Sequence, residues 1–252
     1  MASAVWLLFH TFLLSFSLTT DFLLFCNADP TDGFVPLPLS DENFKIQRPY
    51  DVPLADRYSF VYGVHRMWVY STDKPFEVGN QTPPRTEIRF MHLDYSSGIW
   101  QFEGHTFVPN GTTGTAIMKI LRAKGENPGT DLVLMVYNGE LRFYFDQQVE
   151  PNIYNRWVRV NVIHDADANK VSTFINGVKK QEADGKGPSH FYFKCGVYGQ
   201  VNESNYMESR WRDIKIYKKE TYNNGGRMTQ SNNLMIYIFI YIFIYMYTYM
   251  YM

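Results

Sequence analysis

Two short segments of the chain alternate polar and apolar residues strictly enough to present chemistry on one face of a strand. Read as a strand, HFYFKCGVYGQ (190–200) has an apolar face and a polar face, because successive side chains point to opposite sides. The polar face consists of Tyr192, Lys194, Gly196, Tyr198 and Gln200. A lysine, a phenol and an amide around a glycine that leaves room are typical of a catalytic or binding surface, and equally of the solvated side of a sheet.

A second segment, PRTEIRF (84–90), carries a charged row of the same kind. Alternation places Arg85, Glu87 and Arg89 on one face, opposite Thr86 and Ile88. The central carboxylate can hold both guanidinium groups in position, which leaves their remaining donors free to bind a ligand carboxylate. The alternative is a solvated ladder of ion pairs on an exposed sheet face.

Other polar residues are weaker candidates. In GIWQFEGHTFVP (98–109), Gln101 and His105 share a face, and a lone histidine is more often a surface residue than a base. His164 and Asp165 end an apolar run and are interpreted as turn residues, while Cys195 falls on an apolar face and is interpreted as a small core residue. No residue spacing indicates a metal site, and no cofactor is predicted.

The elements that must position these residues are short strands separated by turns. Asn138-Gly139 and Asn176-Gly177 lie between alternating runs and predict hairpins, and no segment has a sustained helical period. The pattern predicts a single all-β domain, a β-sandwich or jelly roll. Strands are expected near 58–70, 86–92, 98–108, 114–122, 132–138, 140–146, 156–165, 170–176, 190–199 and 209–217.

The two ends of the chain are expected to lie outside this domain. Residues 1–28 form a long apolar run with a small-residue ending at Ala28, which is typical of a secretory signal peptide. Residues 221–252 end in LMIYIFIYIFIYMYTYMYM, a low-complexity segment with tyrosine throughout rather than at interfaces. We interpret this tail as a gene-model artefact, with a membrane anchor as the alternative. The domain is therefore predicted over 29–220, and its proline-rich first segment, 29–44, is expected to be an extended lead-in that packs along the sandwich.

The composition favours a secreted protein without a charged macromolecular partner. Lys and Arg number 24 against 25 Asp and Glu, so no bulk charge attracts nucleic acid, and the domain itself contains no membrane segment. Asn-X-Ser/Thr sequons begin at Asn80, Asn110 and Asn202, as expected for glycosylation along the secretory pathway. The expected destinations are the cell wall or extracellular space, or the vacuole.

Several of these segments resemble a known family. RTEIR and YFKCGVYGQ are similar to paired motifs of the alginate lyase 2 family of polysaccharide lyases. DYSSGIWQFEG, RWVRVNVIHDAD and YMESRWRDIKI resemble the plant subgroup of that family called citrate-binding proteins, and the resemblance covers about residues 29–219. It implies a concanavalin A-like, alginate-lyase-like jelly roll with a concave face lined by the motifs, so that a carboxylated small molecule or an acidic polysaccharide is the expected partner.

The resemblance also implies roles for individual residues. In the lyases, a proton next to a uronate carboxylate is removed, and the neighbouring glycosidic oxygen leaves by β-elimination. Tyr198 would be the proton-handling phenol. The residues that would contact the ligand are Arg85, Glu87, Arg89, Lys119, Lys194 and Gln200.

A third family motif, Gln-Ile/Val-His, is missing. The matching strand is TAIMKILRA, where Lys119, Ile120 and Leu121 occupy the three positions. Lysine can neutralise a carboxylate, but leucine cannot accept a proton, so Tyr198 would have to serve as both base and acid. His92 or His105 would have to lie near Tyr198 to replace the histidine.

Three functions therefore remain open. The first is a non-catalytic protein that binds citrate or an acidic saccharide in a basic groove. The second is a polysaccharide lyase of the alginate or glucuronan type that cleaves uronate polymers with Tyr198 as acid and base. The third is a structural cell-wall or lectin-like protein whose polar face is merely solvated.

Overall fold

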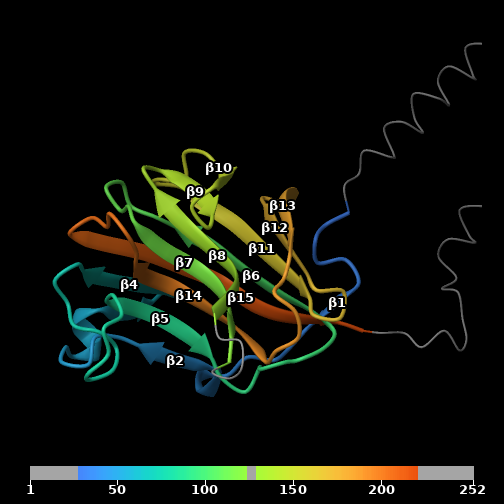
Figure 1. Cartoon of the computed structure of the whole chain (residues 1–252), viewed down its shortest axis with the longest axis horizontal. Helices are drawn as coiled ribbons and strands as arrows, with labels where there is room; N and C mark the ends of the chain where they lie inside the picture. Colours follow the sequence, from blue (N-terminus) through green and yellow to red (C-terminus); the bar gives the residue numbers. More distant parts are fainter. Residues whose placement is uncertain (1–27, 124–128, 221–252) are drawn as a thin grey trace, which may run out of the picture. The chain divides into compact units, whose positions relative to one another are not determined.

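The computed structural model describes residues 28–123 and 129–220, and these form two β-sheets stacked face to face (Figure 1). The all-β sandwich expected from the sequence is confirmed. Apart from Ala28, the predicted signal peptide lies outside the described residues, as does the tail 221–252. Among the described residues, no helix has the length and apolar character needed to cross a membrane.

One sheet has eight strands in the order β13-β12-β11-β6-β15-β4-β3, with β1 also paired to β15. Its strands are β1 (Phe34–Pro36), β3 (Tyr58–Val61), β4 (Val64–Tyr70), β6 (Ile99–Phe107), β11 (Trp157–Asp165), β12 (Lys170–Ile175), β13 (Val178–Asp184) and β15 (Tyr206–Lys219).

The other sheet has seven strands in the order β10-β9-β8-β7-β14-β5-β2. Its strands are β2 (Phe44–Gln47), β5 (Arg85–Phe90), β7 (Thr115–Arg122), β8 (Gly129–Tyr137), β9 (Glu140–Phe143), β10 (Gln147–Glu150) and β14 (Phe191–Gly199). Two single-turn 3₁₀ helices, η1 (Asp41–Asn43) and η2 (Leu54–Asp56), lie in the N-terminal part of the chain. The predicted lead-in, 29–44, thus contributes β1 to one sheet and ends where β2 of the other sheet begins.

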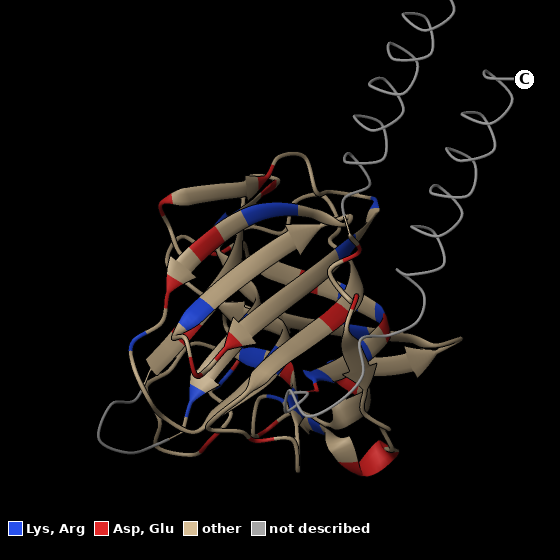
Figure 2. Ribbon diagram, turned by 90° about the vertical axis from the view of Figure 1, so that its right-hand side faces the viewer, with Lys and Arg blue, Asp and Glu red and all other residues tan. Residues whose placement is uncertain are grey.

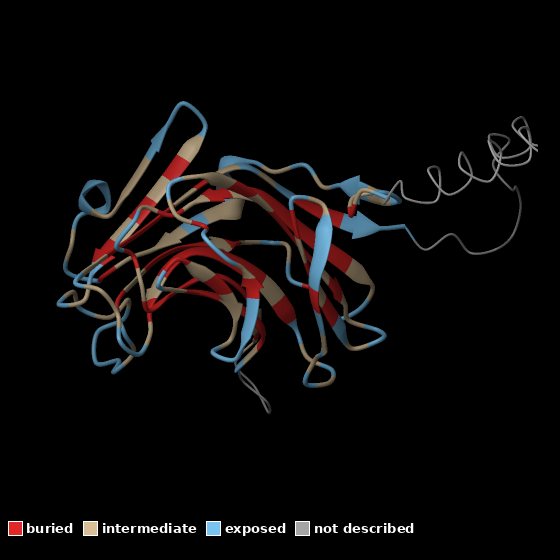
Figure 3. Cartoon of the chain, turned by 90° about the horizontal axis from the view of Figure 1, so that it is seen from above, coloured by how far each residue is buried: buried red, intermediate tan, exposed pale blue. Residues whose placement is uncertain are grey.

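The core lies between the sheets and follows the predicted alternation. Phe191, Phe193, Cys195 and Val197 on β14 are at most 1% exposed and pack in the main apolar cluster, so the small core role predicted for the cysteine is confirmed. Buried residues concentrate in the central strands of both layers, and exposed ones lie in loops and at edges (Figure 3). Lysines, arginines and acidic residues are interspersed over the strands and loops, in keeping with the balanced composition (Figure 2).

Turn chemistry explains both the success and the failure of the strand boundaries. Asn138-Gly139 and Asn176-Gly177 form the predicted hairpins, with positive φ at both residues. The predicted single strand 58–70 is wrong, because Tyr62 (φ 51°) and Gly63 (φ 75°) form a third hairpin between β3 and β4. Tyrosine rarely occupies such a turn, so the residue types do not indicate it.

The prediction of His164 as a turn residue is also wrong. His164 lies within β11 and is fully buried between the sheets. Its Nδ1 is 2.9 Å from the hydroxyl of Tyr95, and its Nε2 is 3.7 Å from an oxygen of Asp131. Burial lowers the pKa of His164 to about 4, so the ring is neutral at neutral pH.

This buried histidine predicts a stability that depends on pH. An unfolded histidine binds a proton below its ordinary pKa of about 6.5, whereas the folded one does so only near 4. The stabilisation is therefore fully present above pH ~6.5 and is lost as the pH falls towards 4, by up to about 3 kcal/mol. In denaturant unfolding measured across this range, H164Q is expected to show a shallower loss than the wild-type protein. H190Q, at an exposed histidine, should retain the wild-type slope.

Candidate functional site

The two polar motifs lie side by side in the centre of the seven-stranded sheet. β14 pairs with β5 on one side and β7 on the other. Gly196 is opposite Glu87, Tyr198 is opposite Arg85, and Lys194 is opposite Lys119. The predicted polar faces of PRTEIRF and HFYFKCGVYGQ therefore form one continuous surface. We call this surface, which points away from the core, the site face.

Gly196 allows the two motifs to approach closely. A Cβ at this position would lie 2.3 Å from the carbonyl oxygen of Thr86 and 2.6 Å from Cα of Glu87, and φ is +145°. Only glycine fits such a contact without displacing the backbone. The pairing of β14 with β7 also shifts register between Cys195 and Tyr198, a bulge that re-aims the side chains around the site.

Glu87 is the centre of a buried ionic cluster. Its carboxylate lies 2.6 Å from Lys119 Nζ, 3.7 Å from Lys194 Nζ and 3.8 Å from a terminal nitrogen of Arg85. The side chains of Glu87 and both lysines are at most 4% exposed, and that of Arg85 is 13% exposed. Three basic side chains thus surround one anion in a region of low dielectric constant, and the excess is two positive charges when all three are protonated.

The charges shift the protonation of the cluster. Burial alone would raise the pKa of Glu87, but the charges of Lys119, Lys194 and Arg85 outweigh it and hold the pKa below its usual value. Burial lowers the pKa of Lys119 to about 7, because Glu87 only partly offsets burial and the repulsion of Lys194 and Arg85. Burial also lowers the pKa of Lys194.

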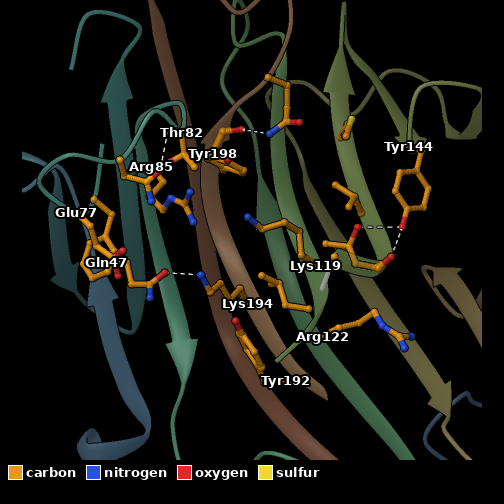
Figure 4. A pocket seen from close by; sticks show the side chains of 18 of the residues that line it. Gln47, Glu77, Thr82, Arg85, Lys119, Arg122, Tyr144, Tyr192, Lys194 and Tyr198 are labelled. Carbon is orange, nitrogen blue, oxygen red and sulfur yellow. Dashed lines mark hydrogen bonds between the residues drawn. The ribbon is translucent and has the colours of Figure 1, made fainter. Parts of the chain in front are cut away.

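A cavity of about 580 Å³ opens above these cations, within the roughly 300–1,000 Å³ typical of small-molecule sites. Arg85, Lys119 and Lys194 point their nitrogen atoms into it, as Figure 4 shows. One side is apolar and belongs to β8 and the residues after β9, and the other is formed by Gln47 and the segment before β5. The lining residues are Gln47, Phe76, Glu77, Asn80, Thr82, Arg85, Lys119, Leu121, Arg122, Gly129, Thr130, Val133, Met135, Tyr144, Phe145, Tyr192, Lys194, Tyr198 and Gln200.

Not every residue predicted to bind a ligand reaches this cavity. Glu87 lies beneath the cations rather than on the wall. Arg89 is not held by Glu87 as the sequence suggested: its guanidinium forms two hydrogen bonds with Asp94, at 2.6 and 2.8 Å, and stacks on Tyr192. Gln200 lines the cavity, but its amide nitrogen donates to the carbonyl oxygens of Tyr198 and Gly199.

Tyr198 lies at the junction of the charged and apolar parts of the site face. The guanidinium of Arg85 is 4.1 Å and Nζ of Lys119 is 4.0 Å from the centre of its ring. Tyr198 also packs against the apolar cluster of Ala116, Val133 and Met135. Burial raises the pKa of Tyr198, so the phenol is protonated at neutral pH and is a proton donor rather than an acceptor.

No histidine lines the cavity among the described residues. Leu121 occupies the position where the family motif has histidine, and it contributes only apolar surface. His105 and Gln101 belong to β6 in the opposite sheet, where His105 Nδ1 lies 3.3 Å from Asp213. His92 follows the far end of β5, beyond Arg89, and so is not beside Tyr198. Within the described ranges, no cluster of His, Cys, Asp or Glu side chains suits a metal ion.

Gln47 is a site residue that the sequence motifs do not indicate. Gln47 on β2 accepts a hydrogen bond from Nζ of Lys194, and it lies opposite Glu87 in the strand register. The alternation of FKIQ (44–47) is the available signal, but it is too short to indicate a strand by itself and lies at the end of the expected lead-in. Asn80, predicted as a glycosylation site, is exposed and also lines the cavity; Asn110 and Asn202 are exposed as well.

Comparison with known proteins agrees with these motifs. The model of the alginate lyase family matches residues 37–218. The chain belongs to the alginate lyase family. It is also 54% identical over 197 residues to the citrate-binding protein of Hevea brasiliensis, covering 78% of this chain and 82% of that protein.

Solved structures of the family share the fold. An alginate lyase of polysaccharide lyase family 7 superposes with a TM-score of 0.57 and 14% identity, covering 70% of this chain and 94% of that one. The alginate lyase from Corynebacterium sp. has a TM-score of 0.54 and 15% identity, covering 73% and 93%. At such identities the likeness concerns the jelly-roll fold and not the reaction.

The ionic cluster predicts that Glu87 is essential for stability. Replacing it with glutamine leaves three buried cations without their counter-charge, so E87Q should lower the free energy of unfolding by about 3–5 kcal/mol. E77Q, at an exposed carboxylate on the cavity wall, should change it by less than ~0.5 kcal/mol. Chemical denaturation of both variants is the measurement, and equal stability would contradict the central role of Glu87.

Proposed function

We propose that this chain binds a small carboxylated molecule in the cavity of the site face without cleaving it, with citrate as the first candidate. The observation that carries the proposal is the convergence of three basic side chains on the single carboxylate of Glu87, at the base of a cavity that no histidine lines among the described residues. The relative from Hevea brasiliensis, which is named a citrate-binding protein, supports this choice of ligand.

The donors in the cavity match a carboxylate. Nε of Arg85 is buried and has no hydrogen-bond partner in the described structure, and the two lysine ammonium groups converge on the same space (Figure 4). Hydrogen bonds between charged groups are the strong ones, and they strengthen further where the groups are as buried as these lysines. An acidic saccharide offers the same carboxylate chemistry and is the second ligand class that these donors suit.

A second candidate function is cleavage of uronate polymers by β-elimination. Tyr198 beside Arg85 and Lys119 supports it, because the cations can neutralise a uronate carboxylate while the phenol donates a proton to the leaving oxygen. The argument against this function is the lack of a good proton acceptor. Leu121 replaces the histidine, and burial raises the pKa of Tyr198, which keeps its phenol protonated.

A third candidate, a structural or lectin-like wall protein, has less support. That function would need only a flat, solvated polar face, whereas here the polar face carries a cavity and largely dehydrated cations. We further propose that the protein enters the secretory pathway and acts in the cell wall or the vacuole, on the basis of its N-terminal segment and exposed sequons.

Citrate should stabilise the purified protein. At a concentration 100 times the Kd, linkage adds about 2.7 kcal/mol, which for a domain of this size raises Tm by about 5–10 °C. R85A should weaken citrate binding by about 10- to 100-fold, because it removes a charge-assisted contact. R156A, at an arginine that pairs with Glu150 and does not line the cavity, should behave as the wild type. Absence of any shift with citrate or uronates would refute the proposed binding function.

Incubation with alginate, glucuronan and pectate tests the second candidate. Elimination creates an unsaturated sugar end that absorbs ultraviolet light, and we expect no increase in absorbance with any of the three polymers. An increase that Y198F abolishes would instead identify the protein as a lyase and would exclude the non-catalytic function.

A further inference from the structure

Two lysines of the site stand directly opposite each other on neighbouring strands. Lys119 on β7 and Lys194 on β14 are cross-strand partners, and both are about 3% exposed. Like charges in this arrangement destabilise a sheet. Glu87 lies 2.6 Å from one and 3.7 Å from the other, so one carboxylate serves both lysines as well as Arg85.

We propose that Lys119 makes the site selective for ligands with two or more carboxylates, because above neutral pH it is held in its charged form only when a ligand supplies the missing negative charge. This inference rests on the proposed binding function and names the ligand class and the residue that selects it. The proton passes from solvent to Nζ of Lys119 as the ligand enters, and no covalent bond between ligand and protein forms.

The surroundings of Lys119 identify it as the group that responds. β14 contributes Lys194 and Tyr198, β5 contributes Arg85 and Glu87, and β8 places the apolar Val133 opposite Lys119. Two further charged residues line the same cavity: Glu77 is exposed, and Arg122 pairs with Asp131.

Lys194 differs from Lys119 in its partner. Nζ of Lys194 also donates to Gln47, whereas Nζ of Lys119 faces Glu87 and the ring of Tyr198. With burial lowering the pKa of Lys119 to about 7, this lysine is the one whose charge changes near neutral pH.

The number of ligand charges then determines whether the cluster is neutral. One carboxylate leaves an excess positive charge, which favours loss of the proton from Lys119. Two carboxylates balance three cations and Glu87, so that Lys119 stays protonated in the complex. By linkage, a ligand that favours the protonated site binds more weakly as the pH rises above about 7, by up to tenfold per pH unit.

Isothermal titration calorimetry of the full chain with citrate, succinate and acetate tests this at pH 8, where simple carboxylic acids are ionised. Repeating each titration in buffers of different ionisation enthalpy gives the number of protons taken up. We expect close to one proton with citrate and succinate and at least tenfold weaker binding of acetate. K119M should reduce the preference for citrate over acetate at least tenfold and abolish the proton uptake.

Two further variants separate charge from structure. K119R remains charged at all pH values used, so it should bind citrate without proton uptake and without the loss of affinity above pH 7. K45M, at an exposed lysine on β2, should match the wild type.

These titrations distinguish a failure of the proposed role of Lys119 from a failure of the proposed binding function. Citrate binding without proton uptake, or with the same uptake in K119M and K119R, overturns the role of Lys119 and leaves the binding function intact. Absence of binding by all three carboxylates overturns both.

Discussion

The carboxylate of Glu87 is the interaction on which the site depends, because it is the only anion that contacts the three converging cations in the described structure. Burying an isolated ammonium group is costly, and it is tolerated only with a paired charge. Glu87 therefore fixes the side chains of three adjacent strands in one arrangement. Since one carboxylate cannot balance three basic groups, the cluster keeps a net positive charge.

The backbone is arranged to make this cluster form. Alternation places Arg85, Glu87, Lys119 and Lys194 on one face while Ile88, Ile120 and Cys195 fill the core behind them. Gly196 brings β14 against the backbone of Thr86 and Glu87, at a distance that excludes any Cβ. The spacing between the central strands of the sandwich therefore sets the distances within the cluster.

The sequence predicted the sandwich and the polar faces because both follow from alternation, and the Asn-Gly turns because positive φ demands those residues. It could not predict which charges pair. The spacing of Arg85, Glu87 and Arg89 suggested a ladder along one strand, whereas Arg89 pairs with Asp94 and Glu87 pairs across strands with Lys119. Such pairing depends on the strand register between segments far apart in the chain. For the same reason Gln47, about 150 residues from its partner Lys194, was overlooked.

The cluster bears on the choice between binding and catalysis. An elimination site must stabilise charge that develops in the transition state and must also move a proton. The cations around Glu87 would meet a ligand carboxylate that is already charged in the ground state, and such uniform binding raises affinity without raising the rate of the chemical step. Position 121 is leucine, and burial raises the pKa of the Tyr198 phenol. The described site therefore has strong donors for a carboxylate in the ground state but no good base to remove a proton. That imbalance favours the proposed binding function over elimination.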